Sequence, residues 1–95
     1  MPELSRFYGI IICIYWSWSE HGAPHIHAYH GRRNHPEWSV VLTIREGRIL
    51  AGRVPDTDIR LIREWMDLHR DELYDAWEAV SNSRKPKKID PPRMS

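Results

Sequence analysis

Cysteine is almost absent from this sequence of 95 residues, which contains only Cys13. One thiol cannot form a disulfide within the chain, and it cannot supply a zinc site made of four cysteines. Because Cys13 stands inside an apolar run, we expect it to be a buried and unreactive thiol. The disulfide-stapled scaffolds of small secreted proteins are therefore excluded.

The chain also lacks an excess of charge of either sign. Fourteen Lys and Arg residues stand against 13 Asp and Glu residues, which gives a formal net charge of +1 with neutral histidines. No global field then draws the molecule to nucleic acid or to anionic lipid. An RNA partner stays an alternative that needs a local basic patch, and the balanced charge weighs against a nuclease.

Long hydrophobic runs are missing as well. The apolar run 10–14 is too short for a membrane span or a signal core, and residues 1–3 have no basic character. We therefore expect a cytoplasmic protein with no membrane partner. The length suits one core, so we predict a single α+β domain over residues 1–82 and an extended, basic, proline-rich tail over 83–95, pinned at most by Ile89.

What the sequence does contain predicts a small sheet. Residues 6–16 are rich in aromatic and β-branched side chains and predict one long, largely buried strand. Turn-forming residues separate it from three shorter strands, which we place at 25–29, 38–44 and 48–52. The connections are loops at 17–24 and 30–36 and a tight turn at 45–48, where Gly47 supplies a positive φ.

Apolar side chains recur every three or four positions after Pro55 and predict one helix over 57–81, capped by Asp56. A break at 70–72 that starts a second helix is the alternative. The fold class is therefore α+β, a small antiparallel sheet of about four strands with a long C-terminal helix packed on one face. Such a sheet leaves edges and a face open, so we expect a homodimer or a protein partner.

Histidines cluster in one stretch of the chain, at His21, His25, His27, His30 and His35. Strand residues two apart point to the same side, so His25 and His27 stand side by side. Neutral imidazoles placed in this way can share a divalent transition metal, Zn or Ni, with His21 or Glu20 as the third ligand. His69 is a further candidate ligand if the helix lies under that face, and otherwise a core histidine.

Two other interpretations of the histidines stay open. His25 and His27 can act as the base and the acid of a small ribonuclease-like toxin, beside Arg6 or Arg32. The histidines can also be purely structural. Separately, Arg6, Arg32 and Arg33 are candidate anion-binding residues, because guanidinium groups match phosphate geometry.

Several motifs resemble a family of small bacterial proteins, the domain of unknown function 4160. They are the opening from Leu4 to Ile10, the Pro24-His25-x-His27 core, Glu64-Trp65 and the run from Leu68 to Arg70. The likeness spans nearly the whole chain. It implies a cytoplasmic protein of a largely uncharacterised family whose members are often suspected to belong to toxin–antitoxin-like gene pairs.

The same resemblance directs attention to His21, His25, His27 and His69. The sequence departs from the family pattern at Glu20, where aspartate is common, and at Ala23, where a second proline is common. Taken together, the residues and the resemblance predict a partner-binding component of a toxin–antitoxin-like module with a histidine-rich divalent-metal site. Whether the protein is an enzyme stays open at this point.

Overall fold

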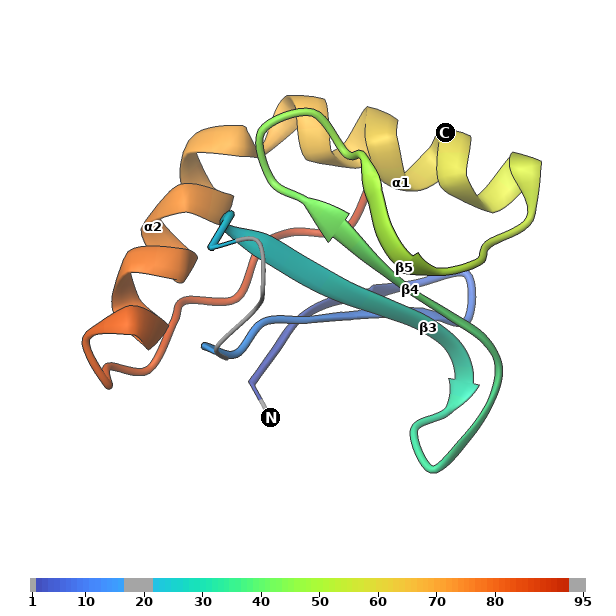
Figure 1. Cartoon of the computed structure of the whole chain (residues 1–95), viewed down its shortest axis with the longest axis horizontal. Helices are drawn as coiled ribbons and strands as arrows, with labels where there is room; N and C mark the ends of the chain where they lie inside the picture. The colour runs from blue at the N-terminus through green and yellow to red at the C-terminus, as the bar shows by residue number, and fades with distance from the viewer. Residues whose placement is uncertain (1, 17–21, 93–95) are drawn as a thin grey trace.

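The computed structural model describes residues 2–16 and 22–92 and has an α+β architecture (Figure 1). Five antiparallel strands form one sheet in chain order, β1 Glu3–Phe7, β2 Ile10–Cys13, β3 His25–Arg32, β4 His35–Thr43 and β5 Ile49–Gly52. Two helices, α1 Asp56–Leu68 and α2 Arg70–Ser81, cover one face of this sheet. The predicted fold class is confirmed, with one strand and one helix more than expected.

The additional strand arises because residues 6–16 form a hairpin and not the single long strand that we predicted. Tyr8 and Gly9 both have a positive φ, 52° and 76°, as the two central residues of a type I′ turn require. A Cβ atom on Gly9 would lie 2.6 Å from Nε2 of His30, so a side chain at that position would require the His30 ring to move. Aromatic and aliphatic residues on both sides of the turn concealed it from the hydrophobic pattern.

Strands β3 and β4 are longer than predicted. The segment 30–36, which we expected to be a loop, continues both strands and reverses at Arg33 and Asn34. The following tight turn is confirmed, because Gly47 has a φ of 67° and its N–H donates to the Thr43 carbonyl at 2.9 Å. The long β3–β4 hairpin therefore forms the centre of the sheet.

The helical region breaks at His69, so the prediction of one helix over 57–81 is wrong, and the alternative of a second helix that starts at 70–72 is close to the structure. His69 has φ −124° and ψ 26°, which ends α1 and precedes α2. Nε of Arg70 donates to the Ile44 carbonyl at 2.9 Å and ties the start of α2 to the chain just after β4. Asp56 is also not the cap that we predicted, because the N-cap residue is Pro55 and it forms no side-chain capping bond.

The core lies between the sheet and the helices. Its fully buried aliphatic and aromatic members come from both layers, and they include Leu4, Ile12, Ile26, Leu42, Ile62, Trp65, Met66 and Leu73. None of the helices in residues 2–16 and 22–92 is long and apolar enough to cross a membrane.

The segment after α2 is extended and returns to the core. Ile89 is buried, and its N–H donates to the Leu4 carbonyl of β1 at 2.8 Å. The Asp90 carbonyl accepts a hydrogen bond from Nε1 of Trp65 at 2.8 Å. This segment therefore contacts β1, the first edge strand of the sheet, through Ile89. The division into a domain and a tail at residue 82 stays a prediction.

Candidate functional site

The register of the sheet decides which side chains share a face. Cys13 pairs with His27, His27 with Val41, and Val41 with Ala51, so these four side chains form one row across β2 to β5. Alternate residues such as Ile26 belong to the core beneath the helices. The row therefore lies on the other face of the sheet, which we call the open face.

His27 lies in this row and is held by Tyr15. The two rings are stacked with centroids 4.2 Å apart at 18°, and Nδ1 of His27 lies 3.3 Å from the Tyr15 hydroxyl. Nε2 of His27 is buried and has no hydrogen-bond partner within the described residues. Burial, and to a smaller extent neighbouring His25, lower the pKa of His27 to about 4. The ring is therefore neutral at physiological pH.

His25 stands beside His27, as the strand periodicity predicted. The two rings meet edge to face with centroids 5.3 Å apart, and the His25 side chain is almost completely buried. Its Nδ1 lies 2.9 Å from the Ala23 carbonyl, which only accepts, so this nitrogen carries a proton. The Trp77 ring of α2 packs against the other side, 4.9 Å away. One ring nitrogen of His25 is thus fixed by the backbone.

Of the other predicted metal ligands, His69 is held by contacts of its own. His69 lies at the helix break, where Nδ1 is 2.7 Å from Oε1 of Glu72 and the ring packs on Trp65. His21 lies outside the described residues. Within residues 2–16 and 22–92, no three His, Cys, Asp or Glu side chains are grouped closely enough to hold a metal ion. The metal site at His21, His25, His27 and His69 stays a prediction.

The arginines predicted to bind an anion lie in two places. Arg6 forms an ion pair with Glu3 at 2.7 Å on β1. Arg32 and Arg33 are exposed at the β3–β4 turn, and neither forms an ion pair with a described residue. Arg33 is therefore available to a ligand or partner, whereas a carboxylate already occupies Arg6. Anion binding stays a prediction for all three.

The prediction for Cys13 is confirmed, but the sequence did not predict that Tyr15 would belong to the site. The thiol is free and buried, as predicted, and its Sγ lies 3.9 Å from the Tyr29 hydroxyl. Burial raises the pKa of Cys13, which keeps the group a thiol. Tyr15 was not singled out, because its contact with His27 follows from the pairing of β2 with β3. Trp77 lies on the apolar stripe of the predicted helical region, but its contact with His25 was not predicted.

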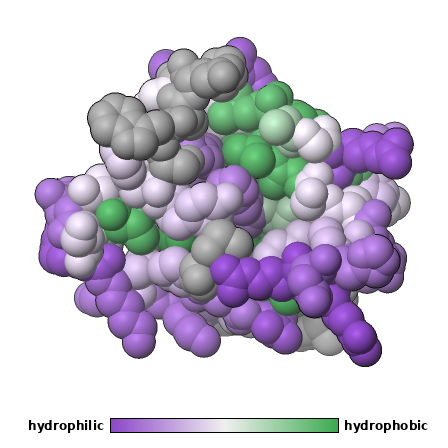
Figure 2. Space-filling model, turned by 60° about the horizontal axis from the view of Figure 1, so that its bottom comes forward, coloured by the Kyte–Doolittle hydropathy of each residue, from purple (hydrophilic) through white to green (hydrophobic). Residues whose placement is uncertain are grey.

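A groove of about 280 Å³ crosses the open face beside His27. Its lining comes from β3, β4, β5 and the β3–β4 turn, and includes His27, Tyr29, Arg33, Ser39, Val41, Ala51 and Gly52. Figure 2 shows this side of the molecule, where apolar side chains gather and hydrophilic ones border them. The open face therefore has an apolar patch that polar side chains border.

The model of the family described as domain of unknown function (DUF4160) matches residues 9–78 of the chain. The chain belongs to this family. No curated protein and no solved structure matches it. The resemblance seen in the sequence is thereby confirmed, and the family's description names no activity. The part matched by the DUF4160 model includes the whole groove and both His25 and His27.

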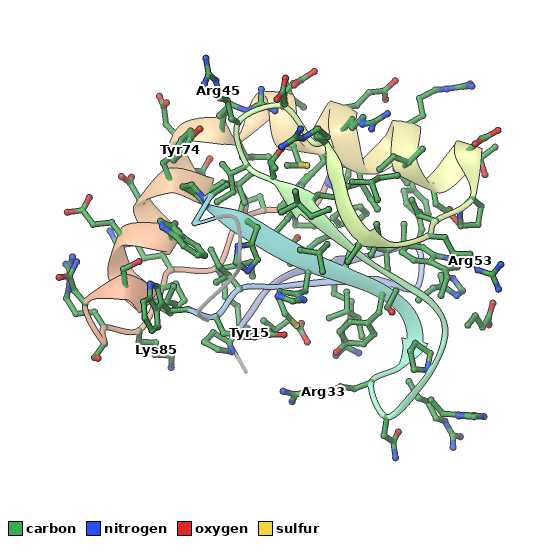
Figure 3. All side chains as sticks on the ribbon, viewed as in Figure 1. Tyr15, Arg33, Arg45, Arg53, Tyr74 and Lys85 are labelled. Atoms are coloured by element: carbon green, nitrogen blue, oxygen red, sulfur yellow. The ribbon has the colours of Figure 1, made fainter. Side chains whose placement is uncertain are left out.

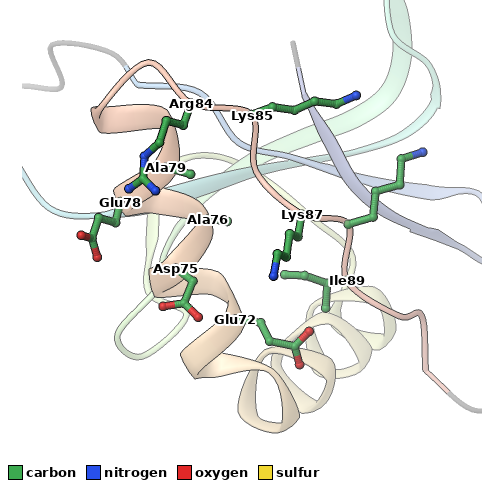
Figure 4. A pocket seen from close by; sticks show the side chains of 10 residues that line it. Glu72, Asp75, Ala76, Glu78, Ala79, Arg84, Lys85, Lys87 and Ile89 are labelled. Atoms are coloured by element: carbon green, nitrogen blue, oxygen red, sulfur yellow. The ribbon is translucent and has the colours of Figure 1, made fainter.

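A larger cavity, of about 380 Å³, lies between α2 and the segment that follows it (Figure 4). Carboxylates from α2 line one wall, and the other wall has Arg84, Lys85, Lys87 and Lys88. These four cations fall outside the part matched by the DUF4160 model, and none of the predicted site residues reaches this cavity. The candidate site is therefore the open face.

Proposed function

We propose that this protein is a partner-binding module that docks a protein partner on the open face of its sheet. The observation that carries the proposal is the groove beside His27, which Val41 and Ala51 line on the side of the sheet away from the helices. Accessible apolar surface with a polar border is typical of protein interaction sites. Membership of a toxin–antitoxin-like pair is supported only by the sequence resemblance.

The groove also indicates which chemistry the partner presents. Its floor is apolar, and Arg33 supplies an exposed guanidinium. This guanidinium forms no ion pair with a carboxylate of the described residues. A partner that inserts an aliphatic side chain and places a carboxylate near Arg33 fits both features. We therefore infer a protein partner with an apolar and acidic contact segment.

We test this proposal by co-expressing the chain with the product of the adjacent gene. The changes Ser39→Glu and Val41→Glu add a carboxylate to the groove, so we expect each to weaken copurification by about tenfold or more. Ser39 is exposed, and a substitution there disturbs no packing.

The matched control is Leu68→Glu, which adds the same charge at a side chain that is 75% exposed on α1. We expect this variant to copurify like the wild type. Equal recovery of all three variants, or no complex with the wild type, would contradict docking on the open face.

A divalent-metal site at His21, His25 and His27 is our second proposal for the same face. One observation favours it, because the unpartnered Nε2 of His27 belongs to a ring that is kept neutral, as a metal ligand must be. We expect about one equivalent of zinc or nickel per chain in protein purified without a histidine tag, and a loss of it in His27→Gln. Fewer than about half an equivalent in the wild type would count against the site.

The ribonuclease-like alternative has less support. An acid–base pair at neutral pH needs one group that is protonated and one that is not. With a pKa of about 4, His27 can serve only as the base, so His25 would have to be the acid. The hydrogen bond from His25 to the Ala23 carbonyl and its contact with Trp77 are equally those of a structural histidine.

A further inference from the structure

The two edges of the sheet differ in their backbone hydrogen bonding. At the β1 edge, Ile89 from the end of the chain donates a backbone hydrogen bond to Leu4. At the opposite edge, β5 pairs with β4 on one side, and no element among residues 2–16 and 22–92 pairs with its other side. Unpaired strand edges expose backbone donors and acceptors and readily accept another strand. The β5 edge is therefore available for strand addition.

This edge is continuous with the groove of the open face. Ala51 and Gly52 belong both to β5 and to the lining of the groove. Leu50 has no partner in the register between β4 and β5, where the ladder contains a bulge. A strand added beside β5 would extend the sheet and place alternate side chains next to the groove. Edge and groove thus form one surface.

The charged side chains around β5 indicate what kind of strand a partner would add. Arg48 and Arg53 flank β5, and Arg45 lies in the turn before it. All three are exposed and form no ion pair with a described residue, and Glu46 is the single carboxylate in 45–53. Figure 3 shows Arg45 and Arg53 projecting outward at opposite ends of this region. The ends of the edge are therefore positive.

The same arginines disfavour pairing of β5 with β5 of a second copy of the chain. If β5 paired antiparallel along its full length with β5 of a second copy, so that Ile49 faced Gly52, then Arg48 of each chain would face Arg53 of the other. Like charges opposite one another destabilise a strand pair. A foreign strand with carboxylates at its ends would replace this repulsion by attraction at both ends.

We propose that the β5 edge binds an extended, acidic segment of a protein partner as an added strand. This rests on the proposed function, because it names the segment by which the partner docks. Backbone hydrogen bonds to β5 hold the segment, its side chains reach the groove, and its carboxylates pair with Arg48 and Arg53.

The test uses a displayed library of random peptides selected against the purified full-length chain. We expect the selected peptides to combine Asp or Glu with a core of Val, Ile or Thr, and to shift the amide NMR signals of β5. The double charge reversal Arg48→Glu with Arg53→Glu should weaken their binding by about tenfold or more. Both side chains are exposed, so the fold should tolerate the change.

The control is the double change Arg60→Glu with Arg84→Glu, which alters the net charge equally at exposed positions in α1 and after α2. It should change the affinity by less than about twofold. The strand addition would be overturned if no peptides were enriched, or if the enriched peptides were neutral or basic. It would also be overturned if the NMR signal shifts were confined to elements other than β5, or if the two double variants weakened binding equally. The arginines would then only protect the edge against association. The proposed function would still stand if Ser39→Glu abolished copurification while the Arg48 and Arg53 variant did not.

Discussion

Because of His27, the free energy of unfolding should fall by roughly 1–2 kcal/mol between pH 6.5 and pH 4. This range is smaller than the pKa shift of the ring alone would give, because solvent partly screens a ring that is not fully buried. The folded protein keeps this ring neutral, because burial disfavours the imidazolium form. In the unfolded chain the same ring binds a proton near pH 6.5. Within this window the unfolded state therefore holds more protons, and acid favours unfolding. The contribution is complete above pH 6.5 and is lost as the pH approaches 4.

Urea denaturation at a series of pH values measures this effect. The variant His27→Phe retains an aromatic ring against Tyr15 but cannot titrate, so its stability should not show the part of the fall that His27 causes. The exposed His35 provides the control, because His35→Gln should follow the wild type. Parallel pH profiles of the wild type and His27→Phe would show that the ring is not buried in its neutral form.

A chain that ends at Asn82 should be less stable than the full chain by about 3–5 kcal/mol. The truncation exposes the site that Ile89 fills and removes the carbonyl of Asp90 that accepts from Nε1 of Trp65. It also deletes the hydrogen bond from Ile89 to Leu4 on β1. The extended segment is therefore expected to act as part of the domain in spite of its polar composition.

Thermal and urea denaturation of the full chain and three variants measure this contribution. A chain that ends at Pro92 keeps all of these contacts and should lie within about 0.5 kcal/mol of the full length. The point variant Ile89→Ala should lose about 2 kcal/mol, because it removes the buried side chain and keeps the backbone. A truncated chain as stable as the wild type would show that residues 83–95 are an independent tail.

Much of the fold follows from local patterns in the sequence. The alternation of His25, Ile26, His27 and Ala28 placed the two histidines on one face, and the structure has them there. The turn at Gly47 followed from the need for a positive φ. Both inferences use only neighbouring residues, and the backbone geometry of a strand or a turn is enough to make them.

The errors lie where neighbouring residues do not decide the structure. The turn at Tyr8 and Gly9 stands between apolar side chains, so hydrophobicity continues while the chain reverses. The helix breaks at His69 without glycine or proline, and the contact that orients α2 is between Arg70 and the distant Ile44. Tertiary contacts of this kind leave no trace in periodicity.

The candidate site could be located but not interpreted from the sequence. Strand periodicity found the histidine pair, yet the stacking of Tyr15 on His27 depends on the pairing of β2 with β3, and the burial that keeps His27 neutral depends on the assembled sheet. The groove depends on β5 reaching the same face through two further strand pairings. These features emerge only when the whole sheet is assembled.

Amide hydrogen exchange on the complex with the product of the adjacent gene tests the central claim, docking on the open face, most directly. We expect slower exchange in β5 and in the part of β4 around Val41 and Ser39, where the groove lies, and unchanged exchange in α1 and α2. Protection confined to the helices, with β4 and β5 exchanging as in the free chain, would contradict the account.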